Sequence, residues 1–136
     1  MDCLFCKIIN KEIPAHIIYE DDEVVAFLDI HPCALGHTVI VPKIHVNNIL
    51  DLPDEKIGSV FERVKKLTGL LEKVLDPDGF TIGINHKEAA GQIINHLHIH
   101  IIPRWSNDGG GSIHSVVNNP PRENLEEIAA LLKKSI

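Results

Sequence analysis

The stretch His96-Leu97-His98-Ile99-His100-Ile101-Ile102 alternates polar and apolar side chains along its length. Strict alternation has the period of a half-buried β-strand, because side chains at i, i+2 and i+4 of a strand point to one face. We therefore expect the three imidazoles on one face, about 6.6–6.8 Å apart, with the intervening aliphatic side chains in a core. Neighbouring imidazoles at that spacing can act together on one phosphate group or one metal ion.

Three interpretations of this histidine stretch remain open on spacing alone. A solvent-facing strand that carries histidine without a function is the least favoured interpretation, because three histidines at strict alternation are improbable by chance. A metal site is the second interpretation, since neutral imidazole is the commonest metal ligand. Catalysis of group transfer is the third, because histidine titrates near neutrality and can act as a nucleophile or as a general acid and base.

The composition defines the class of protein. The chain has 136 residues, of which 44% are hydrophobic and 24% are charged, and this is ordinary for one globular domain with a real core. We expect a single domain, 1–136, whose last part, 106–136, is an arm and a helix. The net charge of −6 gives no reason to expect nucleic acid or an anionic membrane as a partner. No apolar run approaches the roughly 20 residues of a spanning helix, and Met1-Asp2-Cys3 lacks the features of a signal peptide, so the expected location is cytoplasmic.

The three cysteines do not suggest a disulfide framework in a reducing compartment. Cys3 and Cys6 form a C-x-x-C, which indicates half of a zinc site if two more ligands come from elsewhere in the chain. A redox motif and a pair of buried bystander cysteines are the alternatives. His45 is a candidate third ligand, whereas Cys33 has no partner by spacing and is interpreted as a small apolar residue.

Apolar periodicity predicts an α+β fold with a five-stranded, mainly antiparallel sheet. One long helix over 51–75, opened by Asp51 or by Pro53-Asp54, carries an apolar stripe that would cover one face of the sheet. A short C-terminal helix is expected after Pro120-Pro121, and the glycine-rich segment 107–112 is expected to be flexible or an interface arm. Because the long helix separates the third and fourth strands, parallel pairing of those two is the alternative. The expected strands are 16–20, 24–30, 37–42, 80–85 and 96–102, the last closed by Pro103, and a short helical turn is expected over 3–10.

Two other features are candidates for ligand contacts. Asp29 ends an apolar strand, where it either starts a turn before Pro32 or accepts a hydrogen bond from a ligand hydroxyl. The loop 86–95 contains Ala90-Gly91-Gln92 and leads directly into the histidine stretch. A glycine there lets backbone amides approach an anion closely, although such a loop is a weak signal by itself.

The histidine stretch resembles the signature of the histidine triad (HIT) family, His-φ-His-φ-His-φ-φ, in which φ is a hydrophobic residue. The resemblance extends from Cys3 to about Arg104 and covers several further motifs in the same order. It points to the nucleoside phosphoramidate hydrolase branch, also called protein-kinase-C-inhibitor-like, because the dinucleoside polyphosphate hydrolase branch typically lacks the C-x-x-C. The matching motifs are Cys3-Leu4-Phe5-Cys6-Lys7-Ile8-Ile9, Phe27-Leu28-Asp29-Ile30, Gly36-His37-Thr38, Pro42-Lys43-Ile44-His45 and Ala90-Gly91-Gln92.

The resemblance implies a catalytic mechanism and a homodimer whose two sheets join into one of ten strands. His98 would attack the α-phosphorus of a purine nucleotide of AMP or GMP type, and water would hydrolyse the nucleotidyl-histidine intermediate. His100 would contact the phosphate, and His96 would lie beside the nucleophile. The residues implied for nucleotide binding are Asp29 at the ribose hydroxyls, Ile30 at the base, Asn85 on the phosphate and ribose side, and the backbone around Gly91, Gln92 and Ile93.

In zinc-bearing members of this branch, the C-x-x-C pairs with two histidines. Carried over to this chain, the resemblance implies a closed, structural Cys2His2 Zn²⁺ site made of Cys3, Cys6, His45 and His96. This sequence departs from the pattern at His31, where serine is common. It also departs at Ile93, where some members place a phosphate-binding serine, so that backbone donors alone remain there. A dinucleoside polyphosphate hydrolase and a non-enzymatic nucleotide- or zinc-binding module are the alternative functions.

Overall fold

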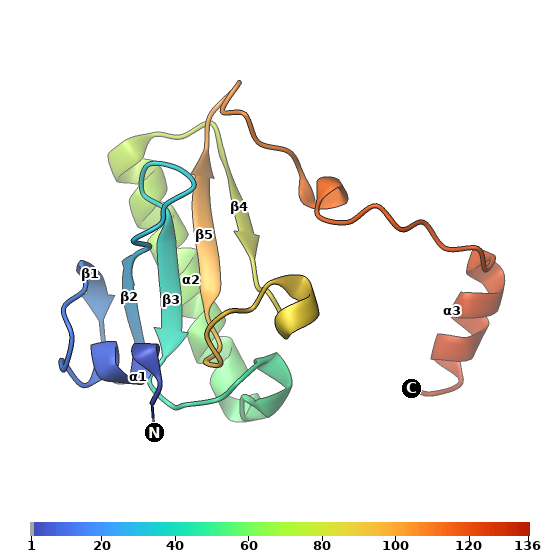
Figure 1. Ribbon diagram of the computed structural model, residues 1–136, viewed down its shortest axis with the longest axis horizontal. Helices are drawn as coiled ribbons and strands as arrows, with labels where there is room; N and C mark the ends of the chain where they lie inside the picture. The colour runs from blue at the N-terminus through green and yellow to red at the C-terminus, as the bar shows by residue number, and fades with distance from the viewer. Residues whose placement is uncertain (1) are drawn as a thin grey trace.

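A five-stranded antiparallel sheet forms the body of the protein, in the strand order β1-β2-β3-β5-β4 (Figure 1). The computed structural model describes residues 2–136. All four strand pairings are antiparallel, and β3 and β4 each pair with β5. The prediction of an antiparallel sheet is therefore confirmed, and direct parallel pairing of β3 with β4 is wrong. The strands are β1 Ile17–Glu20, β2 Val24–Leu28, β3 Thr38–Pro42, β4 Gly79–Gly83 and β5 Ile99–Arg104.

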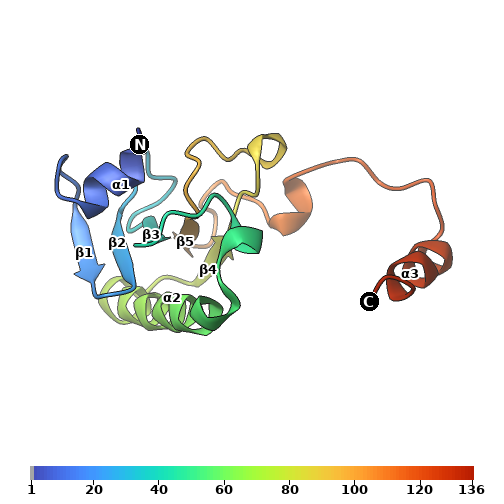
Figure 2. The ribbon, with the colours of Figure 1, turned by 90° about the horizontal axis from the view of Figure 1, so that it is seen from below.

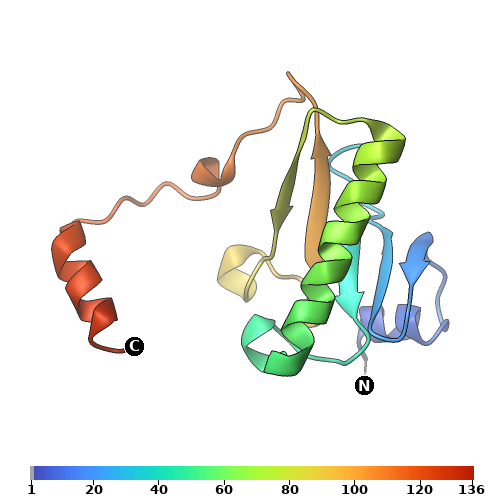
Figure 3. The same ribbon diagram turned by 180° about the vertical axis from the view of Figure 1, so that it is seen from behind.

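The long helix α2, Asp54–Leu75, lies across one face of the sheet (Figures 2 and 3). Its apolar stripe packs on inward-facing side chains of β2, β3 and β5, and this is the larger of two hydrophobic clusters. Of the two predicted openings, Pro53-Asp54 is confirmed and Asp51 is wrong, because the helix begins at Asp54 and Ile49–Asp51 forms a separate 3₁₀ turn. It ends where Asp76 adopts a left-handed conformation, with φ of 49°. The buried members of the stripe are Val60, Val64, Leu67 and Leu71.

The short helix α1, Leu4–Ile9, packs on the opposite face of the sheet. Phe5 and Ile8 of α1 join outward-facing side chains of β2 and β3 in the second hydrophobic cluster. Strands β2 and β3 are therefore buried on both faces. That explains why their sequences read as continuous apolar runs and do not alternate.

The histidine stretch enters the sheet later than its periodicity predicts. Strand β5 begins at Ile99, so His96 and His98 lie in the extended segment before it, and the prediction of a strand from residue 96 is wrong at that end. The Leu97 amide donates to the Val46 carbonyl at 2.7 Å, which anchors this segment to a loop instead of a strand. The alternation nevertheless holds, because Leu97, Ile99 and Ile101 all belong to the core under α2.

Pro103 lies inside β5 and pairs with Phe80 of β4, so the expectation that this proline closes the strand is wrong. Strand β3 pairs with β5 only as far as Ile101. The missing N–H of Pro103 therefore removes no hydrogen bond from the β3 side of the ladder.

Beyond β5 the chain leaves the body as an extended arm that ends in α3, Leu125–Lys133 (Figure 1). The predicted C-terminal amphipathic helix is confirmed, and Asn124 caps it by accepting from the Glu127 amide at 2.9 Å. The segment 107–112 forms a defined turn around Asp108, whose carboxylate accepts from the Gly110 amide and from Arg104. Among residues 2–136, no helix combines the length and the hydropathy that a membrane span requires.

The packing of α2 predicts how much stability the protein loses when a buried side chain of this helix is truncated. Leu67 is 1% exposed, so we expect Leu67→Ala to lower the free energy of unfolding by about 2–5 kcal/mol, since it leaves a cavity. Urea denaturation followed by circular dichroism measures this change. The matched control is Leu50→Ala, at a leucine that is 80% exposed. Similar losses in the two variants would contradict the assignment of the core.

Candidate functional site

His96 is fully buried, and one hydrogen bond determines which of its ring nitrogens carries the proton. Its Nε2 lies 2.8 Å from the carbonyl oxygen of Pro42. A carbonyl can only accept, so Nε2 donates, and in the neutral ring Nδ1 keeps its lone pair. Burial lowers the pKa of His96, which favours this neutral form. The Nδ1 atom lies 3.5 Å from the Cys3 Sγ and is therefore directed at the cysteine pair.

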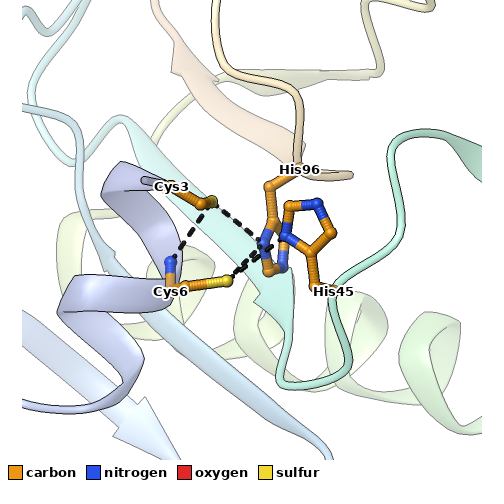
Figure 4. A group of neighbouring side chains, drawn as sticks. All are labelled: Cys3, Cys6, His45 and His96. Atoms are coloured by element: carbon orange, nitrogen blue, oxygen red, sulfur yellow. Dashed lines mark hydrogen bonds between the residues drawn. The ribbon is translucent and has the colours of Figure 1, made fainter. Parts of the chain in front are cut away.

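Four potential metal ligands converge at this point, and Figure 4 shows them coming from α1, from the segment after β3 and from the start of the histidine stretch. Their ligand atoms all lie within 4.8 Å of one another. The residues are Cys3, Cys6, His45 and His96. The structure thus brings together all four residues of the Cys2His2 set.

The spacing of the four ligand atoms fits a tetrahedral ion. The Cys6 Sγ lies 3.2 Å from His45 Nδ1 and 3.6 Å from His96 Nδ1. In a tetrahedral zinc site with Zn–S of about 2.3 Å and Zn–N of about 2.0–2.1 Å, sulfur and nitrogen are about 3.5 Å apart. The Pro42 carbonyl supplies the outer hydrogen bond that orients a histidine ligand. These residues could hold Zn²⁺.

The pKa of Cys6 bears on the redox interpretation of the cysteine pair. Burial, together with the neighbouring Cys3 thiol, raises the pKa of Cys6 to about 11. A redox-active C-x-x-C needs the opposite, a lowered pKa that produces a thiolate at neutral pH. A bound cation would deprotonate both thiols. The environment of the pair therefore suits metal binding better than thiol exchange.

His98 is held by a different bond, with the opposite consequence for its ring. Its Nδ1 lies 2.7 Å from the carbonyl oxygen of His96, so Nδ1 donates and Nε2 keeps the lone pair. The edge of the Phe5 ring packs on the imidazole, with ring centroids 5.0 Å apart. The residue is 8% exposed. The arrangement presents an oriented imidazole whose Nε2 can act as a nucleophile.

His100 takes part in a chain of hydrogen bonds that includes His37, a residue to which sequence reasoning assigned no role. The Cys33 amide donates to His37 Nδ1 at 3.0 Å. In the neutral ring the proton is therefore on Nε2, which lies 2.9 Å from His100 Nδ1 and donates to it. His100 then carries its own proton on Nε2, where it can donate to an anion. The motif Gly36-His37-Thr38 was the sequence signal, but the contact depends on the pairing of β3 with β5.

Asp29 lies beside this pair of rings, with Oδ2 3.5 Å from His37 Nε2. Asp29, His37 and His100 form a second group of potential metal ligands within 4.8 Å. The hydrogen bonds argue against a metal there, because the Cys33 amide occupies the Nδ1 lone pair of His37 and leaves a proton on the nitrogen that would have to ligate. The two clusters are therefore different in kind: one is a ligand set, and the other is a hydrogen-bond relay.

Burial keeps both rings of the relay neutral at physiological pH. It lowers the pKa of His100 to about 4, with further contributions from His98 and His37. It also lowers the pKa of His37, an effect that the negative charge of Asp29 partly offsets. Neutral rings preserve the direction of the relay, because a protonated His100 could not accept from His37.

The predicted nucleotide-binding residues outside the triad lie in two loops. Asp29 does start a turn, since its Oδ1 accepts from the His31 amide at 2.8 Å, but Oδ2 remains directed toward the relay. Ile30 is 72% exposed beside it. In the second loop, the position that a Cβ of Gly91 would occupy lies 3.8 Å from the Asn85 side chain. Gly91 has a φ of 97°, a left-handed conformation that favours glycine.

The loop before the histidine stretch differs in detail from the expected anion loop. The amides of Gly91 and Gln92 donate to the carbonyls of Glu88 and Lys87, so the turn itself uses both of them. The Gln92 side chain is also engaged, because it accepts from the Lys87 amide and donates to the Asn47 carbonyl. Within residues 2–136, the Ile93 amide has no hydrogen-bond partner. Ile93 therefore offers a backbone donor that neither Gly91 nor Gln92 offers.

Cys33 is a free, exposed cysteine, and within residues 2–136 it belongs to neither group of potential metal ligands. Its contribution to the site comes from the backbone, through the bond to His37. No pattern of side chains could have indicated that role.

Known proteins share much of the sequence of this chain. The model of the HIT domain matches residues 10–107, which is well over half of the chain. The chain belongs to the HIT family. An uncharacterised HIT-like protein of Methanocaldococcus jannaschii is 50% identical over 107 residues, 79% of this chain and 82% of its own. An adenosine 5'-monophosphoramidase of Schizosaccharomyces pombe is 36% identical over 110 residues, 81% of this chain and 80% of its own.

The fold of this HIT protein agrees with solved structures of the family. The crystal structure of a HIT family member from Bacillus subtilis superposes with a TM-score of 0.88 at 35% identity. The match covers 100% of this chain and 98% of that chain. The five-stranded antiparallel sheet with its helices is thus a HIT fold, as the motifs predicted.

The relay of this HIT protein predicts how its stability depends on pH. The pKa of His100 is about 4 in the folded protein and 6.5 ordinarily, so the unfolded chain binds more protons between these pH values. The free energy of unfolding should therefore fall as the pH drops from 6.5 to 4, by up to about 3 kcal/mol from this residue. Urea denaturation across that range measures it.

The variant His100→Asn should show a smaller fall over the same pH range, because it removes the titrating ring. His114→Asn is the matched control, since His114 is exposed on the arm. An unchanged pH dependence in His100→Asn would mean that His100 is not buried as a neutral ring.

Proposed function

We propose that this HIT protein is a hydrolase that cleaves the P–N bond of purine nucleoside phosphoramidates of AMP–amine type. The observation that carries the proposal is the bond from His98 Nδ1 to the His96 carbonyl, which leaves an oriented lone pair on Nε2. Support also comes from the family and from the Schizosaccharomyces pombe relative that is named an adenosine 5'-monophosphoramidase.

The first step is a displacement at the α-phosphorus. The Nε2 lone pair of His98 forms a bond to phosphorus while the P–N bond to the amine breaks. The leaving nitrogen takes up a proton from the solvent, and the attacking water of the second step returns one. A neutral imidazole is a competent nucleophile for this reaction, and covalent catalysis divides one difficult displacement into two easier ones. The adjacent His100 would donate its Nε2–H to a phosphate oxygen, because His37 occupies its Nδ1.

The second step is the hydrolysis of the nucleotidyl-histidine. Water attacks phosphorus, the bond from phosphorus to Nε2 breaks, and the products are the nucleoside monophosphate and the neutral ring of His98. The same hydrogen bond to the His96 carbonyl stabilises positive charge on the imidazole while phosphorus is attached, since Nδ1–H remains the donor. His98 is therefore oriented for both steps by one contact.

The nucleoside would be bound by residues at the edges of the triad. Asp29 Oδ2, next to the relay, would accept from ribose hydroxyls, and the exposed Ile30 would pack on the purine base. The Ile93 amide is the backbone donor that we assign to the phosphate, with Asn85 on the same side. The homodimer that the resemblance implies is part of this proposal.

We also propose that Cys3, Cys6, His45 and His96 hold a structural Zn²⁺ ion. Four protein ligands would close the coordination sphere, so the ion would stabilise the fold and take no part in the chemistry. The site would tie α1 to the histidine stretch. Because Phe5 of α1 packs on His98, this tie would also support the position of the nucleophile.

The proposed mechanism predicts a large loss of activity when His98 is replaced. We expect His98→Ala to lower kcat on adenosine 5'-phosphoramidate by about 10³-fold or more, since it removes the nucleophile. Release of AMP followed by chromatography measures the loss. His16→Ala is the control, because His16 is exposed at the start of β1. Turnover near the wild-type level in His98→Ala would exclude the mechanism.

Mass spectrometry of acid-quenched wild-type protein should show an added nucleotidyl group, and this group should be absent from His98→Ala. The same preparation should hydrolyse the phosphoramidate faster than a dinucleoside polyphosphate. A strong preference for the polyphosphate would place the protein in the other hydrolase branch.

Zinc binding predicts a difference between two cysteine variants. We expect about one zinc per chain in the purified wild-type protein, and its loss in Cys6→Ser, because a hydroxyl is a poor zinc ligand in place of a thiolate. Elemental analysis by plasma mass spectrometry measures the content. Cys33→Ser is the matched control and should keep its zinc. Equal zinc in both variants would show that the proposed ligand set is wrong.

A further inference from the structure

Lys87 has a backbone conformation that few residues other than glycine adopt. Its φ is 70° and its ψ is 171°, a combination that is essentially restricted to glycine. Asp76 also has a positive φ, but its ψ of 53° puts it in the left-handed helical region, which other residues tolerate better. Position 87 therefore holds strain that a glycine would avoid.

Hydrogen bonds from Gln92 hold Lys87 in this conformation. The Lys87 amide donates to Gln92 Oε1 at 2.8 Å, and the Lys87 carbonyl accepts from the Gln92 amide at 3.1 Å. Gln92 is 8% exposed, and its Nε2 donates to the carbonyls of Asn47 and Ile94. All the contacts on residue 87 are made by its main chain, so a glycine could make them equally well. The lysine side chain is not needed to build the loop.

The side chain of Lys87 is available to a ligand. It is exposed, and among residues 2–136 it belongs to none of the ion pairs. It is also the only lysine or arginine between residues 79 and 103. Burial keeps His96 and His100 neutral, and Asp29 brings a carboxylate to the site. Lys87 therefore adds a cation beside a group of neutral and acidic side chains.

The loop that carries Lys87 stands on the same side of the sheet as the imidazoles. Figure 2 shows the 3₁₀ turn Glu88–Ala90, in yellow, on the side opposite α2. The imidazoles face that side because the alternating aliphatic residues of the histidine stretch pack under α2. The bonds to Gln92 place Lys87 beside the residue that precedes Ile93, whose amide is the donor assigned to the phosphate.

The geometry of the proposed displacement defines where the amine departs. Attacking and leaving atoms lie roughly in line at phosphorus, so the amine leaves on the side opposite His98 Nε2. His98 is 8% exposed and Ile93 is 89% exposed, so this side faces the solvent at the rim of the site. Because the nucleoside is assigned to the other loop, at Asp29 and Ile30, the leaving group is nearest to the loop of Lys87.

We propose that Lys87 selects phosphoramidates whose leaving amine carries a carboxylate, such as an amino acid joined to AMP through its nitrogen. The ammonium group would pair with the carboxylate at the rim, away from the reacting atoms. The strain at position 87 is then the consequence of placing a cation where a glycine would be unstrained. The inference rests on the proposed function and deepens it by naming the class of leaving group.

Two ligands that differ in one charge test the proposal: the adenosine 5'-phosphoramidates of glycine and of glycinamide. Binding is measured by calorimetry in the His98→Ala background, in which the ligand is not consumed. We expect Lys87→Met to weaken binding of the glycine derivative by about 2–5-fold, the range of an exposed ion pair, and to leave the glycinamide derivative unchanged. Lys87→Arg should keep the preference. Equal effects on both ligands, or no effect, would overturn the proposal.

The variant Lys87→Gly tests the strain separately from the charge. It should lose the preference for the glycine derivative and should raise Tm by about 2–6 °C, because glycine adopts the conformation freely. Lys87→Met should lose the preference without that rise, since it keeps a side chain at the strained position. Scanning calorimetry measures Tm. An unchanged or lower Tm in Lys87→Gly would overturn the assignment, because it would show that position 87 is not strained.

Two control variants and one activity assay separate this inference from the proposed function. Lys73→Met removes an exposed lysine from α2 and should leave both dissociation constants unchanged. Glu88→Gln removes the neighbouring negative charge and should not lower the preference. Hydrolysis by the wild-type protein without preference for the glycine derivative would overturn the inference and leave the hydrolase intact. Binding that depends on Lys87 without any hydrolysis would support the inference and exclude the proposed function.

Discussion

The hydrogen bond from His98 Nδ1 to the carbonyl oxygen of His96 is the contact on which the chemistry of the site depends. It determines the tautomer of the ring, and the tautomer determines that Nε2 holds a lone pair. Backbone groups determine the proton positions of the neighbouring rings in the same way. The Pro42 carbonyl directs the lone pair of His96 at the cysteines. The Cys33 amide makes His37 a donor to His100. The three histidines of one short stretch thus differ in their proton arrangement, because His96 and His98 each bond a backbone carbonyl and His100 bonds the His37 ring.

The two layers of the fold explain how these rings can lie side by side. Leu97, Ile99 and Ile101 hold the histidine stretch against α2, and this fixes the opposite direction for the imidazoles. On that second side α1 brings both Cys3 and Phe5 to the rings, so the ligand cluster and the proposed nucleophile share one short helix. The N-terminal turn and His98 are therefore linked by two contacts, Cys3 with His96 and Phe5 with His98.

Much of the fold could be predicted from the sequence, because each element carries a periodic signal. The stripe of α2 and the alternation of the histidine stretch both led to the correct layers. The start of β5 was misplaced, because periodicity reports which side a residue faces and not whether its backbone has a strand partner. For the same reason the role of Gly91 and Gln92 as amide donors could not be judged in advance, since the turn itself takes both amides.

The sequence by itself determined the family, the alternation that separates imidazoles from core, and the identity of the four cysteines and histidines that cluster in the structure. These follow from local periodicity and from motifs, which need no knowledge of the third dimension. Tertiary structure alone decided that His37 donates to His100, because that contact arises from the pairing of β3 with β5, two strands separated by the whole of α2. Tertiary structure also decided that the arm leaves the body beyond β4. The direction of the arm depends on the contacts of Arg104 with the Thr81 side chain, which is distant in sequence, and with the Gly111 backbone carbonyl.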